Sequence, residues 1–131
     1  MSTPPLPLSS VALLLWSADL TAPQRLATPF VMAQAAVALD LEVELYFVAE
    51  SVRLLMPEAA GQLVGFGEEA RHLGEHLQRT HDLGVTFFAC SQALHAAGLT
   101  RAALTPLCKG LGGMVQFMGR CADPSWRTLV F

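Results

Sequence analysis

The sequence VTFFACSQALHAAG, residues 85–98, indicates the class of fold. Its apolar start, with two phenylalanines, is typical of a strand that is buried on both faces. Residues 92–97 then have the composition of a helix, which Gly98 can terminate. Cys90 and Ser91 stand between the two patterns without an intervening loop. Such a junction is typical of a parallel strand that is followed by its crossover helix.

The same alternation of strand and helix patterns extends over the rest of the chain. Apolar runs predict five strands, over residues 11–16, 41–49, 85–89, 113–118 and 126–131. Helical patterns fall between them, over residues 29–39 with Thr28 as N-cap and Pro29 first, 51–56, 68–83 and 92–97, with short turns over 100–107. We therefore predict a three-layer, doubly wound α/β fold: a mostly parallel, five-stranded sheet with helices on both faces.

One domain of ordinary size accounts for the 131 residues. Residues 1–10 are rich in proline and predict a disordered tail, which leaves residues 11–131 as a single α/β domain. The longest apolar stretch, residues 29–48, is interrupted by Asp40, Glu42 and Glu44, so it does not predict a membrane span. The start of the chain also lacks the charge and length of a signal peptide. We expect a soluble, cytoplasmic protein without a membrane partner.

The composition indicates a protein that covers part of its surface by assembly. Hydrophobic residues make up 53% of the chain, and charged residues make up 15%, against roughly 25% in typical domains. A small chain this apolar is expected to form a homo-oligomer. The net charge of −3 provides no basic field for a phosphate backbone, so we expect no nucleic-acid partner.

Metal binding and disulfide formation have little support in the sequence. The three cysteines are an odd set without CxxC spacing, which favours reduced thiols. His72, Glu75 and His76 match an HxxEH zinc pattern, but no third ligand is identifiable and the predicted helix places the motif on its polar face. We expect neither a metal nor an organic cofactor.

Polar and thiol side chains follow the predicted strands, where the carboxyl ends of parallel strands form one edge of the sheet. Binding sites in such folds lie at this edge. The side chains expected there, besides Cys90, are Asp19, Glu50, Ser51, Ser91, Arg120 and Cys121.

Cys90 is the reactive candidate, because a thiol at a helix start faces unpaired N–H groups and the positive end of the helix dipole, which favour thiolate. The alternative is a buried, inert cysteine that packs as a small hydrophobic side chain. His95 lies too far round the helix to form a catalytic pair with it. Cys121 is a candidate resolving thiol, and Cys108 is assigned no role.

The strand–cysteine–helix segment, residues 87–99, resembles the DsrE/DsrF-like family, in which a cysteine stands eight residues before a glycine, as Cys90 stands before Gly98. The resemblance extends over most of the chain, including residues 30–55 and 123–131. It implies a doubly wound sheet of about five strands, a homotrimer or homohexamer, and, in sulfur-relay members, a cysteine that carries persulfide sulfur between proteins. Cys90 is the matching position. Sulfur-relay members often have a basic pair before the glycine, whereas this chain has Ala96 and Ala97.

The leading hypothesis is a sulfur carrier or sulfurtransferase-type protein, in which Cys90 holds a persulfide between a donor and an acceptor protein. A first alternative is a non-enzymatic, oligomeric protein that binds a small ligand or partner at a sheet-edge pocket near Asp19, Glu50 and Arg120. A second alternative is a thiol redox sensor in which Cys121 resolves oxidised Cys90.

Overall fold

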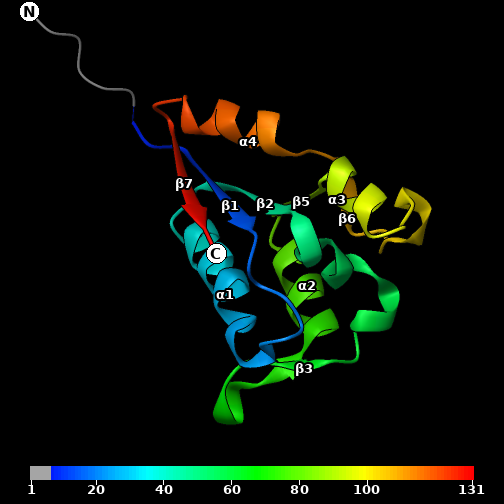
Figure 1. Ribbon diagram of the computed structural model, residues 1–131. Helices are drawn as coiled ribbons and strands as arrows, with labels where there is room; N and C mark the ends of the chain where they lie inside the picture. Colours follow the sequence, from blue (N-terminus) through cyan, green and yellow to red (C-terminus); the bar gives the residue numbers. More distant parts are fainter. Residues whose placement is uncertain (1–6) are drawn as a thin grey trace, which may run out of the picture.

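A five-stranded, entirely parallel sheet forms the centre of the computed structural model, which describes residues 7–131 (Figure 1). Most of the predicted tail, residues 1–10, therefore lies outside the described residues. The order of the strands is β6-β5-β2-β1-β7. The strands are β1 (Ser10–Leu15), β2 (Glu42–Phe47), β5 (Thr86–Ala89), β6 (Cys108–Leu111) and β7 (Trp126–Val130). The chain moves outward from β1 to β6 and then returns to place β7 on the other side of β1, as the predicted doubly wound α/β class requires.

Helices cover both faces of this sheet (Figure 1). Helices α1 (Ala27–Ala38) and α2 (Leu73–Asp82) pack on one face, and α4 (Met114–Cys121) packs on the other, over β1 and β7. Right-handed crossovers explain this division, because connections that step in opposite directions place their helices on opposite faces. The short helix α3 (Ser91–Ala96) follows β5 directly. None of the described helices is long and apolar enough to cross a membrane.

Shorter elements fill the connections. Arg71–His72 (β4) pairs antiparallel with Leu63–Val64 (β3), so α2 begins later than the helix predicted from residue 68. Helix α1 begins at Ala27, which places Pro29 inside the first turn, where its missing N–H leaves no helical bond unmade. Five 3-10 helices complete the description, over Pro23–Arg25, Ala49–Leu55, Pro57–Ala59, Gly67–Glu69 and Arg101–Ala103.

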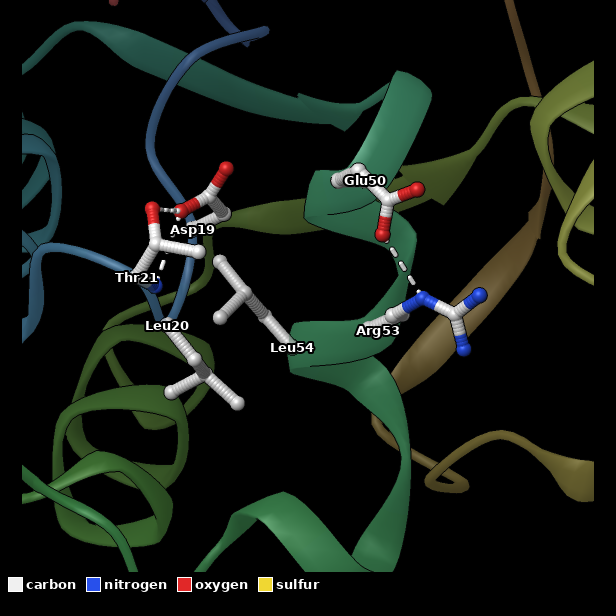
Figure 2. A pocket seen from close by; sticks show the side chains of 6 residues that line it. All are labelled: Asp19, Leu20, Thr21, Glu50, Arg53 and Leu54. Carbon is white, nitrogen blue, oxygen red and sulfur yellow. Dashed lines mark hydrogen bonds and ion pairs between the residues drawn. The ribbon is translucent and has the colours of Figure 1, made fainter.

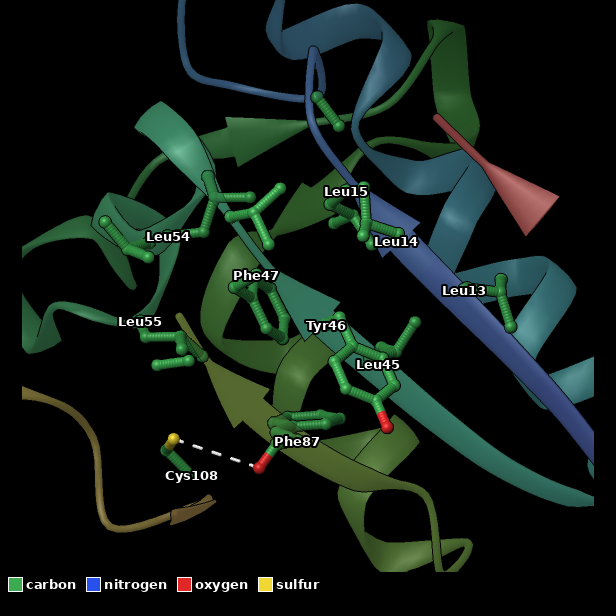
Figure 3. Packing of buried hydrophobic residues seen from close by; sticks show 14 of the residues in the cluster. Leu13, Leu14, Leu15, Leu45, Tyr46, Phe47, Leu54, Leu55, Phe87 and Cys108 are labelled. Atoms are coloured by element: carbon green, nitrogen blue, oxygen red, sulfur yellow. Dashed lines mark hydrogen bonds between the residues drawn. The ribbon is translucent and has the colours of Figure 1, made fainter. Parts of the chain in front are cut away.

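The core has two layers, because successive residues of the central strands point to opposite faces (Figure 3). On the α1 and α2 face, Phe47 packs edge-on against Phe87 of the neighbouring strand, with ring centroids 5.6 Å apart. On the α4 face, Tyr46 packs against Phe88 at 5.3 Å and against Phe117 of α4 at 5.5 Å. Each fully buried side chain of this kind contributes roughly 1.5–3 kcal/mol. Burial on both faces accounts for the apolar runs in the sequence.

The prediction of a strand over residues 113–118 is wrong, because Gly113 is the N-cap of α4 and the helix begins at Met114. The fourth strand is instead β6, which lies at the edge of the sheet and pairs with β5. An edge strand contacts one neighbour, and β6 contains the exposed Lys109 and a glycine, so it has no apolar run to mark it. Residues 119–121 consequently end a helix and do not follow a strand.

The second histidine of the HxxEH pattern is buried, contrary to its predicted place on a polar helix face. His76 stacks on Phe30 of α1 with ring centroids 5.9 Å apart, whereas His72 is exposed. No described side chain or backbone group hydrogen-bonds to His76 Nε2. Burial, followed by the nearby charge of Arg79, lowers the pKa of His76 below its ordinary value of 6.5.

His76 is therefore expected to make the fold acid-sensitive. Since its pKa is lower in the folded than in the unfolded chain, the unfolded chain binds more protons below pH 6.5, and stability falls as the pH falls. One proton sets a limit of about 1.4 kcal/mol per pH unit. Urea denaturation at several pH values should show a weaker loss in His76→Leu than in the wild type. The exposed-site control, His72→Ala, should behave as wild type, and an undiminished loss in His76→Leu would contradict the assignment.

Candidate functional site

Cys90 lies at the carboxyl end of β5, immediately before α3. Its N–H donates to the carbonyl oxygen of Phe47 in β2 at 3.0 Å, and its own carbonyl accepts from Leu94 N–H at 3.0 Å. The residue therefore ends the sheet hydrogen bonding and begins the helix. Gly98, with φ of 70°, adopts the left-handed conformation that ends α3. The predicted strand–cysteine–helix junction is confirmed.

A surface cavity of about 360 Å³ lies beside this thiol. The residues that line it come from the starts of α3 and α4: Cys90, Ser91, Gln92, Gly113, Met114 and Val115. Cys90 is 6% exposed. A Cβ atom placed on Gly113 would lie 3.4 Å from Cys90 Sγ, so the chain before α4 passes directly over the sulfur.

The starts of two helices meet at this cavity. Cys90 is the N-cap residue of α3, and Gly113 is the N-cap residue of α4. No described side chain caps either helix, so N–H groups of both first turns remain for another acceptor. Helix starts carry partial positive charge and favour anions. The surroundings of Cys90 are therefore suited to a sulfur that carries negative charge.

The other two thiols have different environments. Cys108 in β6 is buried, and its Sγ contacts the carbonyl oxygens of Gly110 at 3.4 Å and Phe87 at 3.8 Å (Figure 3). Burial raises the pKa of the Cys108 thiol, which keeps it protonated and unreactive. Cys121 is exposed at the end of α4.

The structure does not bring Cys121 to Cys90. Cys121 Sγ lies 3.4 Å from Thr128 Oγ1 on β7, which is three strand spacings, or about 14 Å, from β5. A disulfide requires Cα atoms within roughly 7 Å. Cys121 therefore has no geometry for resolving oxidised Cys90 within one chain.

A second pocket, of about 320 Å³, lies where β1 and β2 end (Figure 2). Asp19 and Glu50 both line it, but each already has a partner. Thr21 donates to Asp19 from its N–H at 2.9 Å and from its hydroxyl, which lowers the pKa of Asp19. Arg53 Nε lies 2.7 Å from Glu50 Oε2.

Ser51 and Ser91 occupy separate places at this edge. Ser51 is buried, and its hydroxyl donates to the carbonyl oxygen of Ala18 at 2.6 Å, which joins the loops that follow β1 and β2. Ser91 lines the Cys90 cavity. Of the predicted residues, Asp19 and Glu50 thus share one pocket, and Cys90 and Ser91 share the other.

Arg120 lies away from both pockets, because it belongs to α4 and not to a strand end. Its Nε donates to Glu44 Oε1 at 2.9 Å, and its Cζ lies 4.3 Å from the ring centroid of Trp126 at the start of β7. Sequence reasoning missed the contribution of α4 to the Cys90 cavity. Gln116 and Arg120 are four residues apart, as on one face of a helix, and this spacing was the signal in the sequence that could have indicated α4.

The geometry gives no support for a metal site. Within residues 7–131, no three His, Cys, Asp or Glu side chains are grouped so that they can hold a metal ion. His72 Nδ1 lies 3.9 Å from Glu75 Oε1, but His76 is packed against Phe30 instead of facing them.

Fold and site together define a parallel α/β protein with a cysteine at the junction of a strand and a helix. The model of the DsrE/DsrF-like family matches residues 11–131, and the chain belongs to this family. No curated protein matches the chain.

Two solved structures have the same fold. The protein of unknown function MTH1491 from Methanobacterium thermoautotrophicum is 18% identical, with a TM-score of 0.68 over 94% of this chain and 99% of that chain. The ychN protein from E. coli is 17% identical, with a TM-score of 0.65 over 95% of this chain and 100% of that chain. At sequence identities this low, the similarity to these two structures shows a shared fold.

Gly113 is expected to control access to Cys90. In Gly113→Ala the added methyl group would lie 3.4 Å from Sγ and fill part of the cavity. Alkylation of Cys90 by iodoacetamide, followed by peptide mass spectrometry, should slow several-fold, with exposed Cys121 as the internal reference. Gly119→Ala, where a Cβ meets no neighbour within 4 Å, is the matched control. An unchanged Cys90 rate would show that the chain at Gly113 does not limit access.

Proposed function

We propose that this protein is a sulfur carrier of the sulfurtransferase type, with Cys90 as the residue that holds the sulfur. The thiolate of Cys90 attacks the outer sulfur of a donor persulfide, the donor S–S bond breaks, and the donor leaves as a thiolate. Cys90 then carries a persulfide. An acceptor thiolate attacks the outer sulfur in turn and releases Cys90 as thiolate. Both steps are exchanges at sulfur, so they require no external oxidant, metal or organic cofactor.

The observation that carries this proposal is the position of Cys90 between the uncapped starts of α3 and α4. Their N–H groups can donate to an anionic persulfide, and helix starts stabilise negative charge. The cavity of about 360 Å³ offers space for an added sulfur and an incoming thiol. Met114 and Val115 add apolar side chains to its lining.

Membership of the DsrE/DsrF-like family supports the same chemistry, because sulfur-relay members use a cysteine that resembles Cys90 in position. Ala96 and Ala97 replace the basic pair that such members often have, so recognition of the donor and acceptor proteins must use other residues. We place the protein in the cytoplasm, where its three free thiols stay reduced.

Loading with a low-molecular-weight persulfide tests this function directly. Intact-protein mass spectrometry should show one added sulfur of about 32 Da, located on Cys90 by peptide mapping. Cys90→Ser should lose this load, because it lacks the thiol that attacks the donor. Cys121→Ser keeps the Cys90 site intact and should retain the load. Equal loading of the Cys90→Ser protein would exclude Cys90 as the carrier.

Self-assembly is part of the proposal, as a homotrimer or homohexamer. The outer face of α4 and the end of β6 hold four apolar side chains that are about half exposed or more: Leu111, Met114, Val115 and Met118. Apolar patches on small proteins favour association. The face adjoins the Cys90 cavity, so assembly would also shape access to the thiol.

Analytical ultracentrifugation should give a mass of three or six times the 14.0 kDa of one chain. Met118→Lys introduces a charge on the exposed side of α4 and should shift the distribution towards monomer. His95→Lys adds the same charge on exposed α3 and serves as a comparison. A wild-type monomer at micromolar concentration would remove the self-assembly proposal.

Ligand binding at the second pocket is the other candidate function. Its support is the enclosure formed by Asp19, Glu50 and the apolar Leu20 and Leu54 at the carboxyl ends of β1 and β2. This function needs no thiol, so the sulfur-loading experiment separates the two. The separation of Cys121 from Cys90 disfavours a redox sensor that works within one chain.

A further inference from the structure

Glu44 is a buried carboxylate in the middle of the sheet. It lies in β2 between Ala12 of β1 and Thr86 of β5 and is 5% exposed. A buried, ionised carboxylate is destabilising unless it is paired and hydrogen-bonded. Both oxygens of Glu44 have such partners, since Arg120 Nε donates to Oε1 at 2.9 Å and Arg120 Nη2 donates to Oε2 at 3.0 Å.

Tyr46 connects this ion pair to a second side chain of α4. Its hydroxyl donates to Glu44 Oε1 at 2.8 Å and accepts from Gln116 Nε2 at 2.9 Å. Burial, and then the hydrogen bond to Glu44, raise the pKa of Tyr46 to about 12, so the hydroxyl remains a donor at neutral pH. We call these four residues the α4 clamp: Glu44, Tyr46, Gln116 and Arg120.

The α4 clamp supplies the directional contacts between α4 and the sheet. Phe117 is the buried residue of α4, whereas Val115 and Met118 on its outer side are 90% and 60% exposed. One apolar anchor holds the helix on the sheet but leaves its rotation and its displacement along its axis weakly defined. Hydrogen bonds depend on angle and distance, so the bonds of Gln116 and Arg120 define both.

The first turn of α4 is also a wall of the Cys90 cavity, through Gly113, Met114 and Val115. Gln116 follows these residues directly, so a displacement of the helix would move the wall. We propose that the residues of the α4 clamp are positioning residues that hold the first turn of α4 against Cys90. They act through the helix and do not touch the sulfur. The positioning depends on the contacts alone, and its importance for sulfur transfer rests on the proposed function.

Alkylation of Cys90 by iodoacetamide tests the α4 clamp, with buried Cys108 as the reporter of global unfolding. The background is Cys121→Ser, which leaves these two thiols. Tyr46→Phe keeps the packed ring and removes the hydroxyl that joins Glu44 to Gln116. The rate at Cys90 should rise about fivefold, the factor that corresponds to one hydrogen bond of about 1 kcal/mol. Arg120→Gln should raise it further, and Cys108 should stay protected in both variants.

Arg127→Gln is the matched control, because it removes the same charge from an exposed arginine on β7. It should leave the Cys90 rate unchanged. An unchanged Cys90 rate in Tyr46→Phe and Arg120→Gln would overturn the proposal, as would equal acceleration of Cys90 and Cys108, which indicates global unfolding. If Arg120→Gln does not fold, the rate of Cys90 alkylation in Tyr46→Phe tests the proposal by itself. Sulfur loading of the wild type is measured separately, so its absence would refute the proposed function and leave the alkylation result intact.

Discussion

The burial of β1 on both faces is the constraint on which the rest of the structure depends. Each residue of Ser10–Leu15 is buried, and the strand lies between β2 and β7. A parallel strand in this position needs a layer of helices on each side, because its apolar side chains point alternately to both. Helices α1 and α2 provide one layer. The other is provided by α4, which belongs to the connection that returns from β6 to β7.

This return connection brings α4 to Cys90. Gly112 N–H donates to the carbonyl oxygen of Ala89 at 3.0 Å, and a Cβ on Gly112 would lie 3.0 Å from the Phe88 ring. The chain can therefore pass this close to the end of β5 because glycine has no side chain. The next residue, Gly113, faces Cys90 Sγ. The helix that covers the second face of the sheet thus also forms a wall of the candidate site.

The ion pair under α4 contributes more to position than to stability. Desolvation of a buried carboxylate offsets much of the attraction to its partner, so such a pair is seldom a large net source of stability. Glu44 and Arg120 nevertheless meet through two parallel hydrogen bonds, and Arg120 also lies over Trp126. An apolar contact in their place would tolerate sliding of the helix, whereas the paired geometry allows one arrangement.

Local patterns predicted much of the fold and part of the site. The runs that became β1, β2 and β5 were recognisable because these inner strands are buried among apolar side chains. The run that became β7 was recognisable from its own apolar residues, although β7 lies at the other edge of the sheet. The pattern failed at residues 113–118, which were read as a strand although Met114, Phe117 and Met118 have the spacing of one helical face. Of these three side chains only Phe117 is buried. It also failed at β6, whose edge position requires little apolar surface.

The sequence by itself determined the alternation of strands and helices and the place of Cys90 at a strand–helix junction, since both depend on neighbours within a few residues. Only the tertiary structure decided what surrounds that thiol. Gly113 and Met114 reach Cys90 because the connection to β7 must cross the sheet, and Arg120 meets Glu44 across 76 positions of the chain. No local periodicity encodes such meetings, because they result from how all the layers pack together.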